Sequence, residues 1–256
     1  TRCLSDWSSD VCSSDLSRAT PGVLGYDPPG VLGSHALNRA FATLALVAAA
    51  SLCGLVACAS TTVSLAGGSR EYVAADYEIV LRRWTRTEHL IALSELDDLL
   101  TVTATFESHD FRWAYAVRYA HDYRLTVAQR KELLDSALAE TRDVHQFYVA
   151  LYGANHKWTD LTRPTSAWIV RLIDDLGTET APQEIIPIRK PGAIERTYFP
   201  YTSVWRQAFR IRFPVTSASG TPTISPQARW FGLRFAGTLG NQELQWELED
   251  GGVQAR

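Results

Sequence analysis

Apolar and polar residues alternate most strictly between residues 99 and 106. Leu100, Val102, Ala104 and Phe106 alternate there with three threonines. Successive side chains of a strand point to opposite faces of a sheet, so this alternation predicts a half-buried β-strand. Other segments rich in β-branched and aromatic residues, bounded by turn-forming residues, predict seven further strands. Their expected ranges are 77–87, 147–153, 168–174, 184–189, 205–213, 229–236 and 243–249.

A different spacing interrupts the strands after residue 107. A row of aromatic residues four apart consists of Phe111, Tyr115, Tyr119 and Tyr123. The same stretch also alternates as a strand would, but Ser108 as an N-cap and the alanine content favour a helix. Thr126 and Gln129 form a capping box that opens a second helix. The sequence therefore predicts a helical hairpin over about residues 109–146.

The aromatic row has two interpretations. It could be a stacking platform for a sugar or another ring-shaped ligand. It could also be the face by which the helix packs on the sheet, which is the interpretation we favour.

Short strands, polar outer faces and the turns between them indicate the fold class. Turn chemistry separates the later strands at residues 175–177, 219–222 and 237–241. Eight such strands are typical of an antiparallel sandwich. We predict an α+β, mainly β fold: an antiparallel Ig-like β-sandwich over residues 76–250, with the helical hairpin between its second and third strands and a tail at 251–256.

The N-terminal part has the organisation of an export signal. Arg39 is followed by an uncharged run of small and apolar residues that ends in Leu55, Val56, Ala57 and Cys58. This stretch resembles the lipobox of bacterial lipoproteins. The resemblance implies that diacylglycerol is attached to the thiol of Cys58, which becomes the mature N-terminus. The alternative interpretations are a transmembrane helix and a chance tetrapeptide in an alanine-rich segment.

The segments around this signal divide the rest of the N-terminal part. Residues 6–16 resemble a translated sequencing adapter, so residues 1–33 are expected to be a non-native leader and 34–57 the signal peptide; a natural disordered leader is the alternative. Residues 59–75 are small and polar, so we expect a flexible tether over 58–75. Cys3, Cys12 and Cys53 precede Cys58, which leaves no thiol for a disulfide in the exported domain.

The resemblance and the charge balance together predict where the protein acts. In Gram-negative bacteria that sort lipoproteins, an Asp directly after the lipidated Cys resembles a signal for retention in the inner membrane. Ala59 and Ser60 stand at those positions. We therefore expect anchoring in the outer membrane, facing the periplasm, with the membrane as partner through the lipid; a Gram-positive host would place the anchor in the plasma membrane. Lys and Arg number 25 against 28 Asp and Glu, so no nucleic-acid partner is expected.

The sequence contains no catalytic spacing that we recognise. His109 and His121 are twelve residues apart, which places them about 120° apart on one helix, so they do not share a metal site. Paired carboxylates occur at residues 97–98 and 174–175, but neighbouring side chains in a strand or turn diverge, and the second pair fits a hairpin turn. We predict no catalytic residue, no metal and no cofactor.

Two irregular segments are the candidate binding loops, because function tends to lie on loops. The first contains Asn155, His156 and Trp158, and the second contains Tyr198 and Tyr201. The second could equally pack its rings on the core, which we favour. The sequence thus predicts a lipid-anchored, non-enzymatic binding or structural module whose protein or small-molecule ligand is unknown. The alternatives are an exported hydrolase or metal-dependent enzyme, and a lipid or lipoprotein carrier with a deep apolar cavity.

Overall fold

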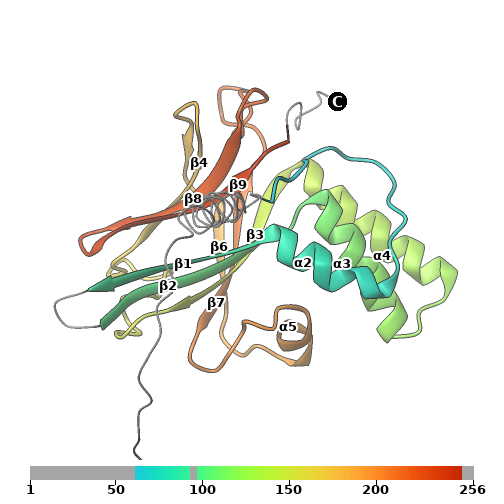
Figure 1. Cartoon of the computed structure of the whole chain (residues 1–256), viewed down its shortest axis with the longest axis horizontal. Coiled ribbons are helices and arrows are strands. Elements are labelled where there is room, and N and C mark those ends of the chain that lie inside the picture. Colours follow the sequence, from blue (N-terminus) through green and yellow to red (C-terminus); the bar gives the residue numbers. More distant parts are fainter. Residues whose placement is uncertain (1–60, 93–96, 250–256) are drawn as a thin grey trace, which may run out of the picture. The chain divides into compact units, whose positions relative to one another are not determined.

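Two antiparallel sheets make up the centre of the domain. The computed structural model describes residues 61–92 and 97–249. Within these residues one sheet has the order β1-β2-β3-β7-β6 and the other β5-β4-β8-β9 (Figure 1). The predicted α+β, mainly β sandwich is confirmed. The strands are β1 Thr85–Ala92, β2 Asp97–Phe106, β3 Val144–Tyr152, β4 Ile169–Asp174, β5 Glu179–Thr180, β6 Glu184–Ile188, β7 Gln207–Pro214, β8 Trp230–Gly237 and β9 Gly240–Glu247.

The helices lie mainly to one side of the strands (Figure 1). The predicted hairpin between the second and third strands is confirmed, and both of its caps are present. Ser108 Oγ accepts a hydrogen bond from the backbone N of Phe111 at 3.0 Å, and Thr126 forms a capping box with Gln129. The helices are η2 Ala74–Asp76, α2 Tyr77–Trp84, α3 His109–Asp122, α4 Val127–Ala139, η3 Glu140–Arg142 and α5 Ala193–Tyr198. None of them is long and apolar enough to cross a membrane.

The predicted strand over 77–87 is wrong. Residues Tyr77–Trp84 form helix α2, and β1 begins only at Thr85. The buried side chains of this helix follow helical spacing: they are Tyr77, Val80, Leu81 and Trp84. That spacing places them on one helical face, and this face packs into the core. The aromatic and β-branched content suggested a strand, but the three-and-four spacing decides the structure.

Strand β2 is buried on both faces, not half-buried as the alternation predicted. Thr101, Thr103 and Thr105 are all buried. Two of the hydroxyl groups contact the segment that follows α5: Thr105 Oγ1 lies 2.7 Å from Tyr201 Oη, and Thr103 Oγ1 accepts a hydrogen bond from Arg206 at 2.9 Å. A short polar side chain can be buried where its hydroxyl finds a partner. The outer face of this strand is therefore covered by chain from about a hundred residues further on.

Aromatic side chains fill the space between the sheets. The rings of Phe106 and Phe231 are 5.1 Å apart, and those of Phe147 and Trp246 are 5.5 Å apart. Each pair joins one sheet to the other. The aromatic row of α3 begins in this core at Phe111 and ends at the surface, where Tyr123 is 51% exposed. The row is therefore a packing face, as we favoured, but the ring contacts of Tyr115 and Tyr119 are with Tyr77 of α2 and Tyr198 of α5 rather than with the sheet.

The segment before α2 is bound to the domain, which contradicts the flexible tether over its described residues. Val63 is buried, its N donates to Glu247 O at 2.8 Å, and its O accepts from Glu249 N at 3.0 Å. Farther along, the side chain of Arg70 forms an ion pair with Asp110 at 3.0 Å. A few such anchors suffice to order a segment whose composition is otherwise small and polar.

Several boundaries differ from the predicted ones. Strand β7 begins at Gln207, and Trp205, which we expected inside it, is 75% exposed in the preceding loop. Strand β9 begins three residues earlier than predicted, because the turn before it is tight and Gly240 adopts a φ of 137°. The expected leader, the signal peptide, Cys58 and the tail at 251–256 lie outside the described residues. The described residues belong to one compact unit.

Candidate functional site

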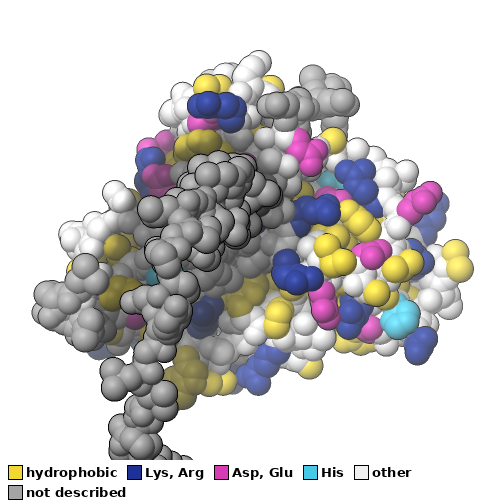
Figure 2. Space-filling view, in the orientation of Figure 1, with side chains coloured by type: hydrophobic (Ala, Val, Ile, Leu, Met, Phe, Trp, Pro, Cys, Tyr) yellow, Lys and Arg dark blue, Asp and Glu magenta, His cyan; other side chains and the backbone are white. Residues whose placement is uncertain are grey.

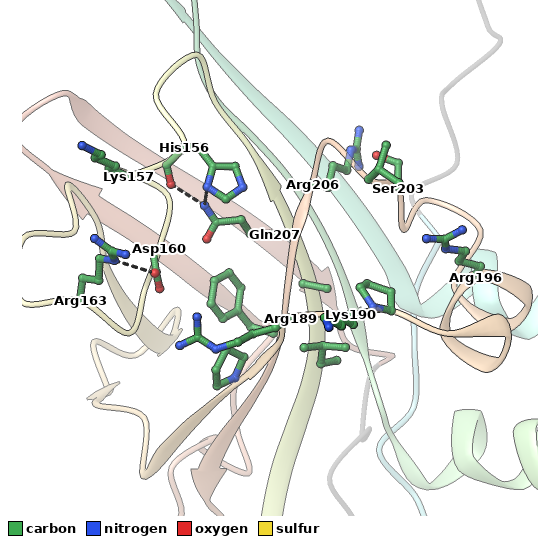
Figure 3. Close-up of a pocket in the computed structure, with 16 residues that line it drawn as sticks. His156, Lys157, Asp160, Arg163, Arg189, Lys190, Arg196, Ser203, Arg206 and Gln207 are labelled. Carbon is green, nitrogen blue, oxygen red and sulfur yellow. Dashed lines mark hydrogen bonds and ion pairs between the residues drawn. The ribbon is translucent and has the colours of Figure 1, made fainter.

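A cleft of about 510 Å³ lies at one end of the β6–β7 pair. Pro187 and Ile188 of β6 pair with Phe209 and Ala208 of β7 and form its base. The loop between β3 and β4 supplies one wall, and the chain from the end of β6 through α5 to β7 supplies the other (Figure 3). This volume is within the usual range for small-ligand sites, about 300–1,000 Å³.

The side chains that line the cleft are strongly cationic. One carboxylate, Asp160, is present, and it forms an ion pair with Arg163 at 3.0 Å. Within the described parts of the chain, four of the cations make no side-chain ion pair or hydrogen bond: Lys157, Arg189, Lys190 and Arg196. Several like charges in a concave site raise the local concentration of anions. The six cations of the cleft are Lys157, Arg163, Arg189, Lys190, Arg196 and Arg206.

Asp160 organises the loop that carries two of these cations. Its carboxylate accepts hydrogen bonds from the backbone N of Thr162 at 3.1 Å and from Thr162 Oγ1 at 2.6 Å, in addition to the Arg163 pair. Burial raises the pKa of Asp160, but the hydrogen bonds from Thr162 and Arg163 outweigh it, so that the pKa lies below its usual value. The carboxylate therefore stays ionised at neutral pH and holds Arg163 in place.

The side chain of His156 contacts Gln207, the first residue of β7. The amide Nε2 of Gln207 is within hydrogen-bond distance of both the backbone O of His156 and its Nδ1, the latter at 2.7 Å (Figure 3). A carbonyl oxygen only accepts, so the amide NH₂ group faces His156, and Nδ1 accepts as well. This contact joins the loop between β3 and β4 to the first residue of β7.

The opposite wall is fixed by the buried face of β2. Arg206 donates from Nη1 to Thr103 Oγ1 at 2.9 Å. Ser203, Val204 and Arg206 line the cleft between α5 and β7, and Figure 3 shows Arg196 beside them on the same side. The cations of the cleft thus come from three separate segments that only the folded chain brings together.

The candidate binding residues predicted from sequence fall into two groups. His156 lines the cleft, Asn155 Oδ1 accepts from the backbone N of Lys157 at 3.0 Å and shapes the same loop, and Trp158 is 44% exposed but is not among the lining residues. Tyr198 and Tyr201 are not among the residues that line the cleft. The Tyr198 side chain is buried, and its hydroxyl donates to Asp122 at 3.0 Å.

The segment that carries these tyrosines packs on the core. Phe199 stacks on Tyr148, with ring centroids 3.8 Å apart and an interplanar angle of 2°. Tyr201 Oη lies 2.7 Å from Thr105 Oγ1. The core-packing interpretation of this run is therefore confirmed.

The acidic pair at residues 174–175 has a structural role, and the two histidines singled out from the sequence lie on one helix. Asp174 is buried and its Oδ1 accepts from the backbone N of Leu176 and of Thr178, at 3.1 and 2.8 Å, which confirms the predicted hairpin turn. Asp175 forms an ion pair with Arg229 at 3.0 Å. His109 and His121 both lie on α3, and no group of three His, Cys, Asp or Glu side chains suited to a metal occurs in the described part of the chain.

Sequence reasoning missed the cations of the second wall. The chain as a whole has nearly balanced charge, and the visible helical surface in Figure 2 carries interspersed basic and acidic side chains. A local signal existed, because Arg189, Lys190 and Arg196 lie within eight residues that contain one acid, Glu195. Their proximity to Lys157 and Arg163 depends on tertiary structure and has no counterpart in the sequence.

Comparisons with known proteins identify no family for this chain. No protein-family model matches the chain, and no curated protein matches it. The chain is similar to a crystal structure from Burkholderia pseudomallei, described as a novel protein of unknown function, with 13% sequence identity and a TM-score of 0.34. The similarity covers 68% of this chain and 82% of that chain. The fold and the cleft define a β-sandwich domain with a cationic cavity.

Proposed function

We propose that this protein is a lipid-anchored module of the bacterial cell envelope that binds an anionic ligand in the cationic cleft. One observation supports an anionic ligand: six cations line the cleft, and its single carboxylate is already paired with one of them. Unpaired basic side chains that face a shared cavity are stabilised by a ligand with negative charge.

The rest of the lining narrows the chemistry of the ligand. Pro187, Ile188, Pro191 and Val204 add apolar surface beside the cations. A site of this mixed kind suits a molecule with a phosphate or carboxylate group and an apolar body, because both parts then find a matching surface. The proposed ligand is an anionic amphiphile.

Binding is favoured over hydrolysis by the state of the two groups in the cleft that could act as bases. Asp160 is held by Arg163 and Thr162. The Nδ1 atom of His156 is occupied by the amide of Gln207. A general base needs an accessible lone pair within hydrogen-bond reach of the proton that it removes. The cleft offers charge and surface for binding, and its potential bases serve to fix the loop.

The proposal also includes a lipid anchor on Cys58. The lipobox-like Leu55, Val56 and Ala57 support acylation of Cys58 and location in the outer membrane, facing the periplasm. Cys58 precedes Val63 by five residues, and Val63 is bound to β9. Five extended residues span about 17 Å. A lipid on Cys58 would therefore hold the domain close to the bilayer and would leave it little length of free tether.

Binding of octyl phosphate, measured by isothermal titration calorimetry on residues 59–256, tests the cleft. We expect saturable binding that weakens as salt is added. The variant Arg189→Glu/Lys190→Glu should weaken it by about tenfold or more, since two attractive charges become repulsive. The matched control is Arg130→Glu/Lys131→Glu, a second Arg-Lys pair, whose side chains are exposed on α4 outside the cleft.

Two results would contradict the proposal. One is an affinity for octyl phosphate that is equal in the cleft variant and the unaltered protein. The other is an equal loss in both charge-reversed variants, which would indicate a general effect of net charge.

A further inference from the structure

Two large apolar side chains project from the rim of the cleft. Val204 is 71% exposed and Trp205 is 75% exposed. Among the described residues, Val127 at 88% is the one large apolar side chain with greater exposure. Exposing an indole ring to water is unfavourable, so its prominence beside a ligand cleft points to an apolar environment that covers it when the protein functions.

This exposed tip is held in a fixed position. Before it, Thr202 is buried, with its Oγ1 2.9 Å from Tyr148 Oη. After it, Arg206 is bonded to Thr103 of β2. The three residues between these anchors form a short loop with both ends bound to the sheet. The exposure of Trp205 is therefore a property of the fold and does not arise from a loose segment.

Cations line the cleft beside this tip. Val204 and Arg206, the neighbours of Trp205 in the chain, both line the cleft, and so do Arg196 and Lys190. An amphipathic ring flanked by basic residues is the arrangement found where proteins meet the headgroup region of a bilayer: the ring enters the interface and the cations remain at the level of the phosphates.

We infer that this rim docks on the surface of an anionic phospholipid bilayer, with Trp205 and Val204 entering the headgroup region and the cationic cleft receiving a lipid phosphate. The inference rests on the proposed anion-binding function of the cleft and names its ligand as a membrane lipid. We infer a bilayer because the unpaired cations are complementary in charge to anionic headgroups. The apolar part of the lining suits the glycerol and upper acyl region of the same lipid.

Co-sedimentation with vesicles tests the inference. Residues 59–256, without a lipid anchor, should bind vesicles of phosphatidylglycerol mixed with phosphatidylethanolamine and should not bind vesicles of phosphatidylcholine alone. Binding should weaken with salt, because the attraction extends only about 8 Å at physiological ionic strength. Trp205→Ala should reduce vesicle affinity by about tenfold. Val127→Ala, which removes an exposed apolar side chain from α4, should leave it unchanged.

A second measurement is the depth to which the Trp205 ring enters the bilayer. Lipids brominated on the upper acyl chain should quench part of the tryptophan emission of the bound protein, and Trp205→Ala should abolish that quenching. Circular dichroism of this variant should match the unaltered protein, since the side chain lies outside the core.

The outcomes separate this inference from the proposed function. If octyl phosphate binds in the cleft but anionic vesicles do not bind, the membrane inference is overturned and the cleft function stands. Vesicle binding that needs Trp205 while octyl phosphate does not bind would overturn the cleft as an anion site and retain the docking surface. Equal vesicle affinity of Trp205→Ala and the unaltered protein would overturn the inference, and the exposed ring would then be available to a protein partner.

Discussion

The guanidinium of Arg70 donates a hydrogen bond from Nε to Oδ1 of Asp110 over 3.0 Å. The same carboxylate accepts from Tyr72 Oη at Oδ1 and from Trp84 Nε1 at Oδ2, the latter at 3.0 Å. The buried side chain of Asp110 on α3 thus joins the segment before α2 to the last residue of α2, Trp84. Charge-assisted hydrogen bonds to a buried carboxylate are stronger than neutral ones.

We therefore expect Asp110→Asn to destabilise the domain by about 2 kcal/mol, the usual range for losing hydrogen bonds to a charged group. The loss should stay near this value because Arg70 and Arg83 are partly exposed and remain solvated. Urea unfolding measures the change. Asp135→Asn, at an exposed position of α4, is the control and should be neutral. Equal stability of the two variants would refute the role of Asp110.

The pH dependence of stability should reveal the same carboxylate. Burial raises the pKa of Asp110, but hydrogen bonds from Tyr72, Trp84 and Arg70 outweigh it, so that its folded pKa lies below the unfolded value of about 3.9. The unfolded chain then binds more protons in acid, and stability is lost as the pH falls through the folded pKa. Above about pH 5 the contribution should be constant. Unfolding midpoints measured from pH 7 to pH 3 should fall less steeply for Asp110→Asn than for the unaltered protein.

Local patterns predicted the elements whose partners are close in sequence. The strand over residues 99–106 and the caps at Ser108 and Thr126 each depend on contacts within a few residues, and all three are present, although the strand is buried on both faces. Helix α2 was missed because its aromatic and β-branched residues favour a strand by composition while their spacing favours a helix. When two local signals conflict, packing against the rest of the chain decides.

The errors about burial have a different cause. Thr103 is covered by Arg206, and Val63 is paired beside β9, so each depends on a contact more than a hundred residues away. The cleft likewise depends on contacts between residues that are distant in the sequence. The sequence placed His156 in a candidate loop, but it could not indicate that Arg189 and Lys190 would line the same cavity. The loop after β3 and the chain after β6 meet because both strands pair with β7.

The close approach of β8 and β9 depends on Gly232. A Cβ atom at this position would collide with the backbone O of Leu244 on the neighbouring strand. Gly232→Ala should therefore destabilise the domain by about 3 kcal/mol, the upper range for overpacking. Gly220→Ala is the matched control, because Gly220 has a φ of 81° but open space around its Cβ, and it should cost about 1 kcal/mol from backbone strain alone. Thermal unfolding of the two variants distinguishes a steric clash from a conformational cost.

The proposed anchor makes a prediction in the native host. Stable membrane attachment requires more than one acyl chain, and a lipidated Cys58 would carry a diacylglycerol with a further chain on its amino group. Cys58→Ser removes the acceptor thiol, so this variant should be released from membranes or accumulate unprocessed. Membrane fractionation and gel mobility measure both outcomes. A serine variant that fractionates with membranes and has unchanged mobility would refute lipidation.

The side of the envelope is tested by separating the two membranes on a density gradient. Ala59 and Ser60 follow the lipidated position, and neither is the Asp that resembles an inner-membrane retention signal. We expect the protein with outer-membrane markers and protected from protease added to intact cells. Replacing Ala59 with Asp should move it to the inner-membrane fraction, while Ala59→Ser should not. Recovery of the unaltered protein with inner-membrane markers would overturn this location, and cleavage on intact cells would place the domain on the outer surface. Because sorting depends on a receptor that recognises the first residues, neither substitution should change the stability of the domain that begins to pack at Val63.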